Sequence, residues 1–142
     1  MCFFLYLASD NKLETEEWEE KNPKVVISSK GDISFVETEK FTKENIYFVS
    51  SSEGCGCGFR QKFDVEYPDY LEIEQKVEKD KNQQQLFELM QKVLKNEEYI
   101  ELVGCWDGDQ ESEIEFRREI KLEELLEESF FFREKEFIKV TK

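Results

Sequence analysis

The sequence predicts a single α+β domain over residues 1–142, with one mixed or antiparallel sheet of about six strands packed by one main helix and by short helices. Two observations support this prediction. Short apolar runs typical of strands recur along the chain, whereas a long helical repeat of apolar residues occurs at about 81–95. Hydrophobic residues make up 39% of the 142 residues, so one domain of this length can bury a core without disulfide or metal support.

The first part of the chain is expected to hold four strands and one short helix. Residues 2–8 are apolar on both faces, as in a central strand that is covered on each side. The acidic segment 13–20 has helical spacing of its apolar residues, so we expect a short helix there. Segments 25–27 and 33–36 are predicted to form a hairpin, and 46–49 is a second fully apolar strand.

The middle of the chain carries the one long helical pattern. Residues 60–67 alternate between apolar and charged side chains, as in a half-exposed strand, and 69–79 fits either a strand or a helix. The main helix is predicted for about 81–95, because Asp80 and Gln83 are typical of a helix start. The predicted apolar face of this helix consists of Leu86, Leu89, Met90, Val93 and Leu94.

The last third of the chain is expected to return to strands. Residues 99–103 form an apolar strand that runs into the polar turn 104–109, and 114–116 alternates as its return strand. A brief helix is expected at 121–128, and 130–140 is expected to add one or two strands. No linker, repeat or low-complexity segment divides the sequence, which favours a single domain.

The chain is strongly acidic. Its 34 Asp and Glu residues against 20 Lys and Arg residues give a formal net charge of -14, which repels nucleic acid and anionic membranes. We therefore expect no nucleic acid and no membrane partner, whereas a basic protein could bind the acidic surface. The apolar N-terminal run lacks the positive charge and length of a signal peptide, so we expect a cytoplasmic protein with reduced thiols. The oligomeric state does not follow from these observations.

The sequence contains no histidine, and this absence excludes several mechanisms. Ser-His-Asp and Cys-His nucleophilic sites need an imidazole base. Zinc and non-haem iron sites with histidine ligands are excluded for the same reason. The glycine motifs of dinucleotide-binding and phosphate-binding loops are absent as well, which argues against nucleotide-dependent chemistry.

Segment 50–59 is the part of the sequence that bears most directly on function. Cys55 and Cys57 alternate with glycines directly after the apolar strand 46–49. Glycine allows unusual backbone conformations and a close approach to a bound atom, and two sulfurs two residues apart can act on the same centre. The predicted ligand-binding residues of this loop are Glu53, Gly54, Gly56 and Gly58.

Three polar loops, at 9–10, 50–58 and 104–110, each follow an apolar strand. If those strands run side by side in one direction, the loops share one edge of the sheet, and the sulfurs of Cys55, Cys57 and Cys105 converge. These three cysteines are therefore the predicted metal ligands. The predicted ligand-binding residues of the 104–110 turn are Trp106, Asp107 and Asp109.

The thiols of this predicted site admit more than one interpretation. Soft sulfur ligands suit zinc or copper(I), and Cys2 could supply a fourth sulfur. Alternatively, Cys55 and Cys57 could close a strained, easily reduced disulfide and act in thiol redox chemistry. The cysteines could also be small buried hydrophobic residues without a chemical role, above all Cys2 in its apolar strand.

Cys2 offers a different enzymatic interpretation. Met1-Cys2 followed by an apolar strand is similar to the start of amidohydrolases with an N-terminal cysteine, although the similarity covers only these residues. The resemblance implies that removal of Met1 would expose a cysteine nucleophile whose own α-amine serves as its base.

Taken together, these residues predict a ligand-binding or metal-binding module that uses the Gly-Cys-Gly-Cys-Gly loop, with no pattern that demonstrates catalysis. Its expected partner is a small ligand. The cofactor is left open, either none or a thiolate-bound metal such as zinc. The alternatives are a protein-interaction module that neutralises a basic partner, and a thiol redox or N-terminal-cysteine hydrolase enzyme.

Overall fold

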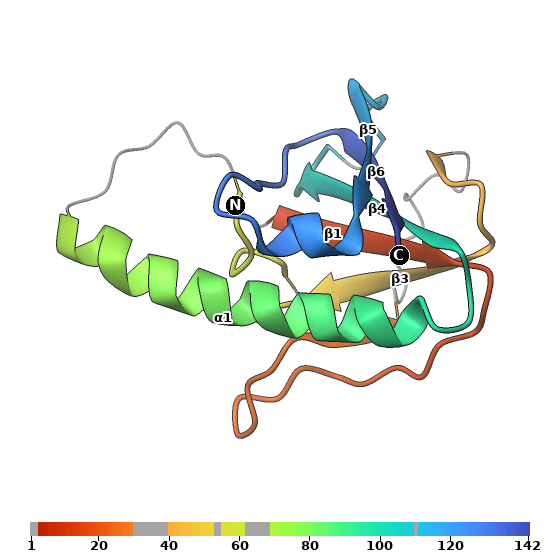
Figure 1. Cartoon of the computed structure of the whole chain (residues 1–142). Coiled ribbons are helices and arrows are strands. Elements are labelled where there is room, and N and C mark those ends of the chain that lie inside the picture. The colour runs from red at the N-terminus through yellow and green to blue at the C-terminus, as the bar shows by residue number, and fades with distance from the viewer. Residues whose placement is uncertain (1–2, 30–39, 53–54, 62–68, 110) are drawn as a thin grey trace.

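The computed structural model describes residues 3–29, 40–52, 55–61, 69–109 and 111–142 (Figure 1). Six strands in this part of the chain form one mixed sheet in the order β2-β3-β1-β4-β6-β5. The strands are β1 (Phe3–Ser9), β2 (Val26–Ser29), β3 (Asn45–Ser50), β4 (Tyr99–Trp106), β5 (Phe116–Lys121) and β6 (Glu136–Thr141). The helices are α1 (Asp69–Val93) and the short 3₁₀ helix η2 (Leu122–Leu126). The predicted α+β fold is confirmed.

The first strand occupies the centre of the sheet, as its apolar sequence predicts. β1 runs antiparallel to both of its neighbours, and Leu5 faces Val49 of β3 on one side and Gly104 of β4 on the other. On the far side of β4, β6 is antiparallel to β4 and parallel to the edge strand β5. A strand in this position has both faces covered, which explains why it tolerates no charged residue.

The main helix is longer than the sequence pattern predicted. α1 begins at Asp69, so 69–79 is helical and the predicted start at Asp80 is wrong. The Asp80 carboxylate instead accepts hydrogen bonds from Arg60 and Lys76. In Figure 1, α1 lies across one face of the sheet. No helix in the described ranges is both long and apolar enough to cross a lipid bilayer.

The predicted apolar face of the helix is confirmed where it meets the sheet. This face is buried at Leu86, Met90, Val93 and Leu94 and half-buried at Leu89. The spacing of these residues places them on one side of a helix, and burial of that side holds α1 against the strands.

The helix predicted for 13–20 does not form. The backbone N–H of Leu13 donates to the Tyr47 hydroxyl at 2.8 Å, and the N–H of Glu16 donates to the Ile27 carbonyl at 2.9 Å. These bonds to distant residues take the place of local helical bonds, because the segment runs alongside β2 and β3. Helix propensity in a short acidic segment is too weak to compete with such contacts.

The C-terminal strands pair differently from the prediction. β4 pairs with β6 instead of with a return strand at 114–116, and 130–140 contributes β6 as its one strand in the sheet. The burial pattern of β6 alternates buried and half-buried residues, so it fits an inner position, whereas β5 is mostly exposed and lies at the edge. The brief helix predicted at 121–128 is present as η2.

Two predicted elements fall on parts of the chain that are not described. The strand 33–36 and the turn before it lie outside the described residues, as does most of the strand predicted for 60–67. Within the described part of that second segment, Gln61 forms an isolated bridge with Phe132 and no longer strand.

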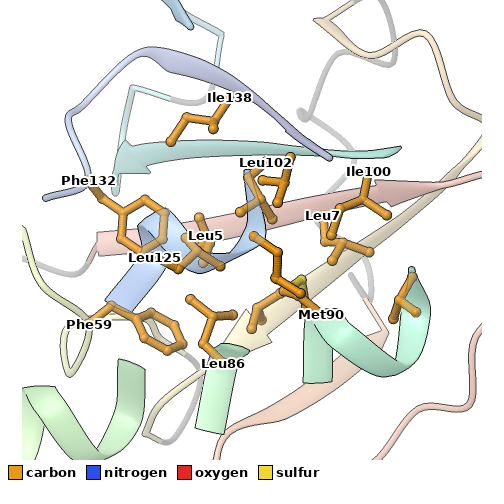
Figure 2. Packing of buried hydrophobic residues seen from close by; sticks show 14 of the residues in the cluster. Leu5, Leu7, Phe59, Leu86, Met90, Ile100, Leu102, Leu125, Phe132 and Ile138 are labelled. Carbon is orange, nitrogen blue, oxygen red and sulfur yellow. The ribbon is translucent and has the colours of Figure 1, made fainter. Parts of the chain in front are cut away.

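The main hydrophobic core lies between the sheet and α1, and Figure 2 shows its side chains from close by. It includes Leu5, Leu7, Leu86, Met90, Ile100, Leu102 and Ile138 among its buried members. A second, smaller cluster contains Tyr6, Ala8, Phe41, Ile46, Val103 and Cys105. Successive residues of a strand point to opposite faces, so the two clusters cover the two faces of the sheet.

A buried ion pair ties the segment before β3 to the segment before β4. The Lys43 ammonium lies 2.8 Å from an Asp10 carboxylate oxygen and 3.0 Å from Glu97 Oε1. The side chains of Lys43 and Glu97 are each only 3% exposed, whereas that of Asp10 is 66% exposed. The ammonium also lies 4.0 Å from the centroid of the Tyr99 ring.

The environment of this ion pair keeps both partners charged. Burial alone would raise the pKa of Glu97, but hydrogen bonds from the Ser9 hydroxyl, the Asp10 N–H and Lys43 outweigh it and hold the pKa below its usual value. Burial likewise lowers the pKa of Lys43, but its bonds to Asp10 and Glu97 leave it above the ordinary value. Nearby, Glu101 accepts hydrogen bonds from the backbone N–H groups of Thr42 and Lys43, at 2.8 and 3.0 Å.

Candidate functional site

Two of the three polar loops expected to carry the site lie at the same end of the strands. β3 and β4 are both antiparallel to β1, so they run parallel to each other with β1 between them. The loops that follow them therefore lie on either side of the N-terminal end of β1, beside Phe3. The loop at Ser9 and Asp10 follows β1 itself, so it lies at the opposite end of the strands.

The cysteine loop is attached to the start of β1 through the backbone of Phe3. The N–H of Gly56 donates to the Phe3 carbonyl at 2.7 Å, and the N–H of Phe3 donates to Cys57 Sγ at 3.2 Å. The chain then turns, with the Phe59 N–H bonded to the Gly56 carbonyl at 3.1 Å. These bonds fix the Cys57 sulfur beside the central strand.

The loop is also held by the main helix. Asn82 Nδ2 donates to the Gly58 carbonyl at 3.1 Å, and the Gly58 N–H donates to the Ser51 hydroxyl at 2.8 Å. A Cβ atom at Gly58 would lie 2.6 Å from Asn82 Nδ2 and 2.7 Å from Ser51 Oγ. Glycine at this position therefore allows the loop to lie close to the helix.

Phe59 anchors the end of the loop in the main core. Its side chain is fully buried, and its ring meets that of Phe132 edge-on with centroids 6.1 Å apart. Figure 2 shows both rings at one end of the core, with Leu86 of α1 next to Phe59. Because the loop is fixed at both ends, its two sulfurs are presented in a defined arrangement.

Cys57 is the half-buried sulfur of the loop, and a cation lies near it. Its side chain packs against the main core without being fully covered. Lys79, on α1, is close enough for the charges of the two groups to interact. The pKa of Lys79 lies below its ordinary value, because the effect of burial outweighs the raising effect of charge on Cys57. A negative charge on Cys57 would therefore favour the charged form of Lys79.

Cys55 has a different environment from Cys57. It is 9% exposed, and its sulfur lies 2.9 Å from the Ser52 hydroxyl. The backbones of the same two residues are bonded as well, with the Cys55 N–H donating to the Ser52 carbonyl at 3.3 Å. Neither cysteine is in a disulfide.

Gln61 adds a buried polar group beneath the loop. It is 5% exposed, and its Nε2 donates to the Gly56 carbonyl at 2.9 Å. Its other amide atom, Oε1, is buried and accepts no hydrogen bond from the described residues. A buried acceptor without a donor is costly in a folded protein, so this atom marks a polar position next to Gly56.

Cys105 lies on the other face of the sheet from Cys57. In β4, Trp106 packs against the main core on the α1 face, and Cys105 before it belongs to the smaller cluster with Tyr6. Alternation along a strand places these neighbouring side chains on opposite faces. Cys57 and Cys105 therefore do not converge as predicted, because the position of a residue in a strand, and not only its nearness to a loop, decides where its sulfur points.

The Cys105 thiol is expected to be unreactive in the folded protein. Burial raises its pKa to about 12, and neither the charge of Lys40 nor a hydrogen bond from Tyr6 offsets this effect. Because the thiolate is the form that reacts, iodoacetamide should modify Cys105 far more slowly in the native protein than in urea at mildly alkaline pH. Peptide mass mapping after timed quenching measures both rates, and equal rates would contradict the burial described for this residue.

The remaining predicted ligand-binding residues are dispersed around the same sheet edge. Trp106 meets the Phe3 ring edge-on at a centroid distance of 5.7 Å. Asp107 is exposed, and Asp109 forms a carboxyl–carboxylate contact with Glu134, whose pKa is raised by burial and by Asp109. Glu53, Gly54 and Cys2 lie outside the described residues, so the N-terminal-cysteine interpretation is not tested.

A three-sulfur metal centre is not formed by the described residues. Within 3–29, 40–52, 55–61, 69–109 and 111–142, no group of three or more Cys, Asp or Glu side chains is arranged to hold a metal ion. The predicted ligands Cys55 and Cys57 share a loop, whereas Cys105 faces away from it. The chemistry that remains at the loop is that of two thiols, of which Cys57 accepts the backbone N–H of Phe3 and interacts electrostatically with Lys79.

Sequence reasoning missed three residues that shape this site. Phe3, Lys79 and Gln61 come from β1, from α1 and from the segment after the loop. No local pattern in the sequence marks them, because each acquires its role by packing against a segment distant in sequence. Knowledge that 69–79 is helical would have pointed to Lys79, since that turn of α1 leads towards the loop-binding residue Asn82.

A separate groove lies between α1 and the segment that precedes β2. Its volume is about 1150 Å³, with Leu13, Val25 and Leu89 in its apolar part and lysine and glutamate side chains around it. None of its lining residues is a cysteine, so it is distinct from the thiol loop.

Comparisons with known proteins give no relative for this chain: no family model, no curated protein and no solved structure matches it significantly.

Proposed function

We propose that this protein is a ligand-binding module whose functional group is the Cys57 thiolate, presented by the Gly-Cys-Gly-Cys-Gly loop. The observation that carries this proposal is the hydrogen bond from the Phe3 N–H to Cys57 Sγ, 3.2 Å long. An electrostatic interaction between Lys79 and the same thiol supports it. Both groups favour negative charge on sulfur, and a cation near a partly exposed cysteine is typical of reactive thiols.

The ligand that this environment suits has a soft, electrophilic centre. A thiolate is a soft nucleophile and a soft metal ligand, whereas the hard cations prefer carboxylate oxygens. The loop offers two thiols but no third ligand among the described residues, which favours an organic electrophile or a disulfide sulfur over a closed zinc site.

The proposed setting of the protein is the cytoplasm. Cys55, Cys57 and Cys105 are not in disulfides, which is compatible with a reducing compartment, where disulfides seldom persist. The net charge of -14 supports small molecules or basic proteins as partners and disfavours nucleic acid.

The rate of thiol alkylation tests the proposal. At neutral pH, iodoacetamide is expected to modify Cys57 faster than Cys55 or Cys105, and Lys79→Met should slow the Cys57 reaction about threefold to tenfold, because the thiolate loses its nearby cation. Rates at single cysteines are read by peptide mass mapping of samples quenched over time.

Lys81→Met is the matched control for this experiment. Lys81 is an exposed lysine of the same helix, two positions from Lys79, so its loss removes the same net charge without touching the loop. An equal slowing by both substitutions, or a Cys57 rate no higher than that of Cys55, would contradict the proposal. Metal analysis of protein purified without reducing agent adds a second check, because a stoichiometric bound zinc would favour the metal-binding alternative.

A further inference from the structure

The two cysteines of the loop differ in ways that matter for chemistry between them. Cys57 is half-buried and accepts the Phe3 N–H, whereas Cys55 is 9% exposed and lies against the Ser52 hydroxyl. The Cys57 sulfur is thus placed to react first with an external molecule, and the Cys55 sulfur is placed to react with Cys57 afterwards. This asymmetry resembles the division between an attacking and a resolving thiol.

The spacing of the two residues permits a bond between their sulfurs. Residues two apart in a chain have Cα atoms separated by about 7 Å at most, which overlaps the range found in disulfides. Gly56 between them has no side chain, and a Cβ there would lie 3.1 Å from the Phe59 ring. The chain can therefore turn tightly between the sulfurs without a steric block.

The contacts of the loop indicate that such a disulfide would be easily reduced. In the dithiol form, Cys57 Sγ accepts the Phe3 N–H, and Gln61 and Asn82 bind the carbonyls of Gly56 and Gly58. Closing a small ring within a loop that is fixed in this way strains these hydrogen bonds. Strained disulfides have more oxidising potentials and are the labile, catalytic ones.

From these features we infer that Cys57 and Cys55 form a dithiol pair that reduces small-molecule disulfides, with Cys57 attacking and Cys55 resolving. The inference rests on the proposed role of Cys57 and adds a reaction to it. The Phe3 N–H is the group that stabilises the attacking thiolate, and Ser52 holds the resolving thiol in place.

The reaction balances in two steps. The Cys57 thiolate attacks one sulfur of a disulfide RSSR, so the Cys57–SR bond forms, the S–S bond breaks, and RS⁻ leaves and takes a proton from water. Cys55 then gives its proton to water, and its sulfur attacks Cys57 Sγ. The Cys55–Cys57 disulfide forms and the second RS⁻ leaves. Two electrons pass from the two cysteines to RSSR, and an external dithiol can return the pair to its reduced form.

Hydroxyethyl disulfide, a small neutral disulfide, is the probe for this reaction. The reduced wild-type protein should release two equivalents of mercaptoethanol and lose two hydrogens in mass, with the disulfide mapped to Cys55 and Cys57. Cys55→Ser should stop at a mixed disulfide on Cys57 after one equivalent, and Cys55→Ala should do the same. Cys57→Ser should react at least about tenfold more slowly than the wild type.

The possible results separate this inference from the proposed function. If the wild type accumulates the mixed disulfide on Cys57 as Cys55→Ser does, the resolving role of Cys55 is overturned while the reactive Cys57 thiol stands. If Cys57 reacts no faster than Cys105 with the probe and with iodoacetamide, both proposals are overturned. Cys105→Ala should behave as the wild type, since its thiol lies on the other face of the sheet.

Discussion

Glu97→Gln is expected to destabilise the protein by roughly 3–5 kcal/mol, because it leaves the buried Lys43 ammonium without its buried carboxylate. Lys43 and Glu97 are each 3% exposed in their side chains, so water cannot replace the lost partner. The Ser9 hydroxyl and the Asp10 N–H lose a charged acceptor in the same substitution. Urea unfolding followed by circular dichroism measures the change in the free energy of unfolding.

Two further variants make this result specific to the buried pair. Glu98→Gln removes an exposed carboxylate from the next position and should change stability by no more than about 0.5 kcal/mol. Lys43→Met combined with Glu97→Met should cost less than the two single substitutions together, because no lone charge is left buried. A loss below about 1 kcal/mol for Glu97→Gln would show that the pair is solvated in solution.

The same pair predicts a pH dependence. The folded-state pKa of Glu97 lies below its ordinary value of 4.5, so the stability that it contributes is complete above that pH and is lost as the pH falls through the lowered pKa. The folded-state pKa of Lys43 lies above 10.5, so its contribution is lost only as the pH rises beyond that value. The difference in stability between the wild type and Glu97→Gln should therefore be constant near neutral pH and shrink in acid.

Gly104→Ala is expected to cost about 2–3 kcal/mol through crowding in the main core. A Cβ at this position of β4 would lie 2.4 Å from Cζ of Phe3, a distance at which something must move. The Phe3 ring is 1% exposed and contacts the rings of Trp106 and Phe132, so it has little room to do so. Thermal and urea unfolding provide the measurement.

The effect of Gly104→Ala should extend to the thiol site. Phe3 donates its N–H to Cys57 Sγ, so a displaced Phe3 should also change the alkylation rate of Cys57. Phe3→Leu shortens the crowded side chain, and the double variant should lose less stability than the two substitutions added together.

Gly108→Ala is the control that separates crowding from backbone strain. Gly108 has a φ of +99° and nothing within 4 Å of a Cβ, so alanine there should cost about 1 kcal/mol through strain alone. A Gly104→Ala variant as stable as the wild type would contradict the packing described around Phe3.

The sequence was sufficient to predict the elements that depend on strong local patterns. The apolar runs at 2–8, 46–49 and 99–103 became the three neighbouring central strands, and the apolar repeat of 81–95 became the buried face of α1. The runs at 2–8 and 99–103 and the helix face bury most of the side chains that their patterns marked, whereas Tyr47 and Phe48 in 46–49 are half-buried. Hydrophobic periodicity indicates directly which side chains of an element are buried, which is why these predictions succeeded.

The sequence was insufficient where distant contacts override local preference. The segment 13–20 has helical spacing but bonds to Tyr47 and Ile27, and 114–116 alternates like a return strand although β6 takes that position. Start signals also misled, since Asp80 lies within α1 and pairs with Arg60. In each case the competing interaction comes from a residue far away in the sequence.

For the candidate site, the sequence by itself determined the chemistry that is available: thiols between glycines, no histidine, and an acidic chain. The tertiary structure decided which thiols share that chemistry. It turned Cys105 to the other face of β4, and it brought the N–H of Phe3 to Cys57, whose charge Lys79 of α1 also senses. The sequence specifies the type of each residue. The direction of a side chain and the charge around it depend on strand pairing and helix packing, which only the folded chain establishes.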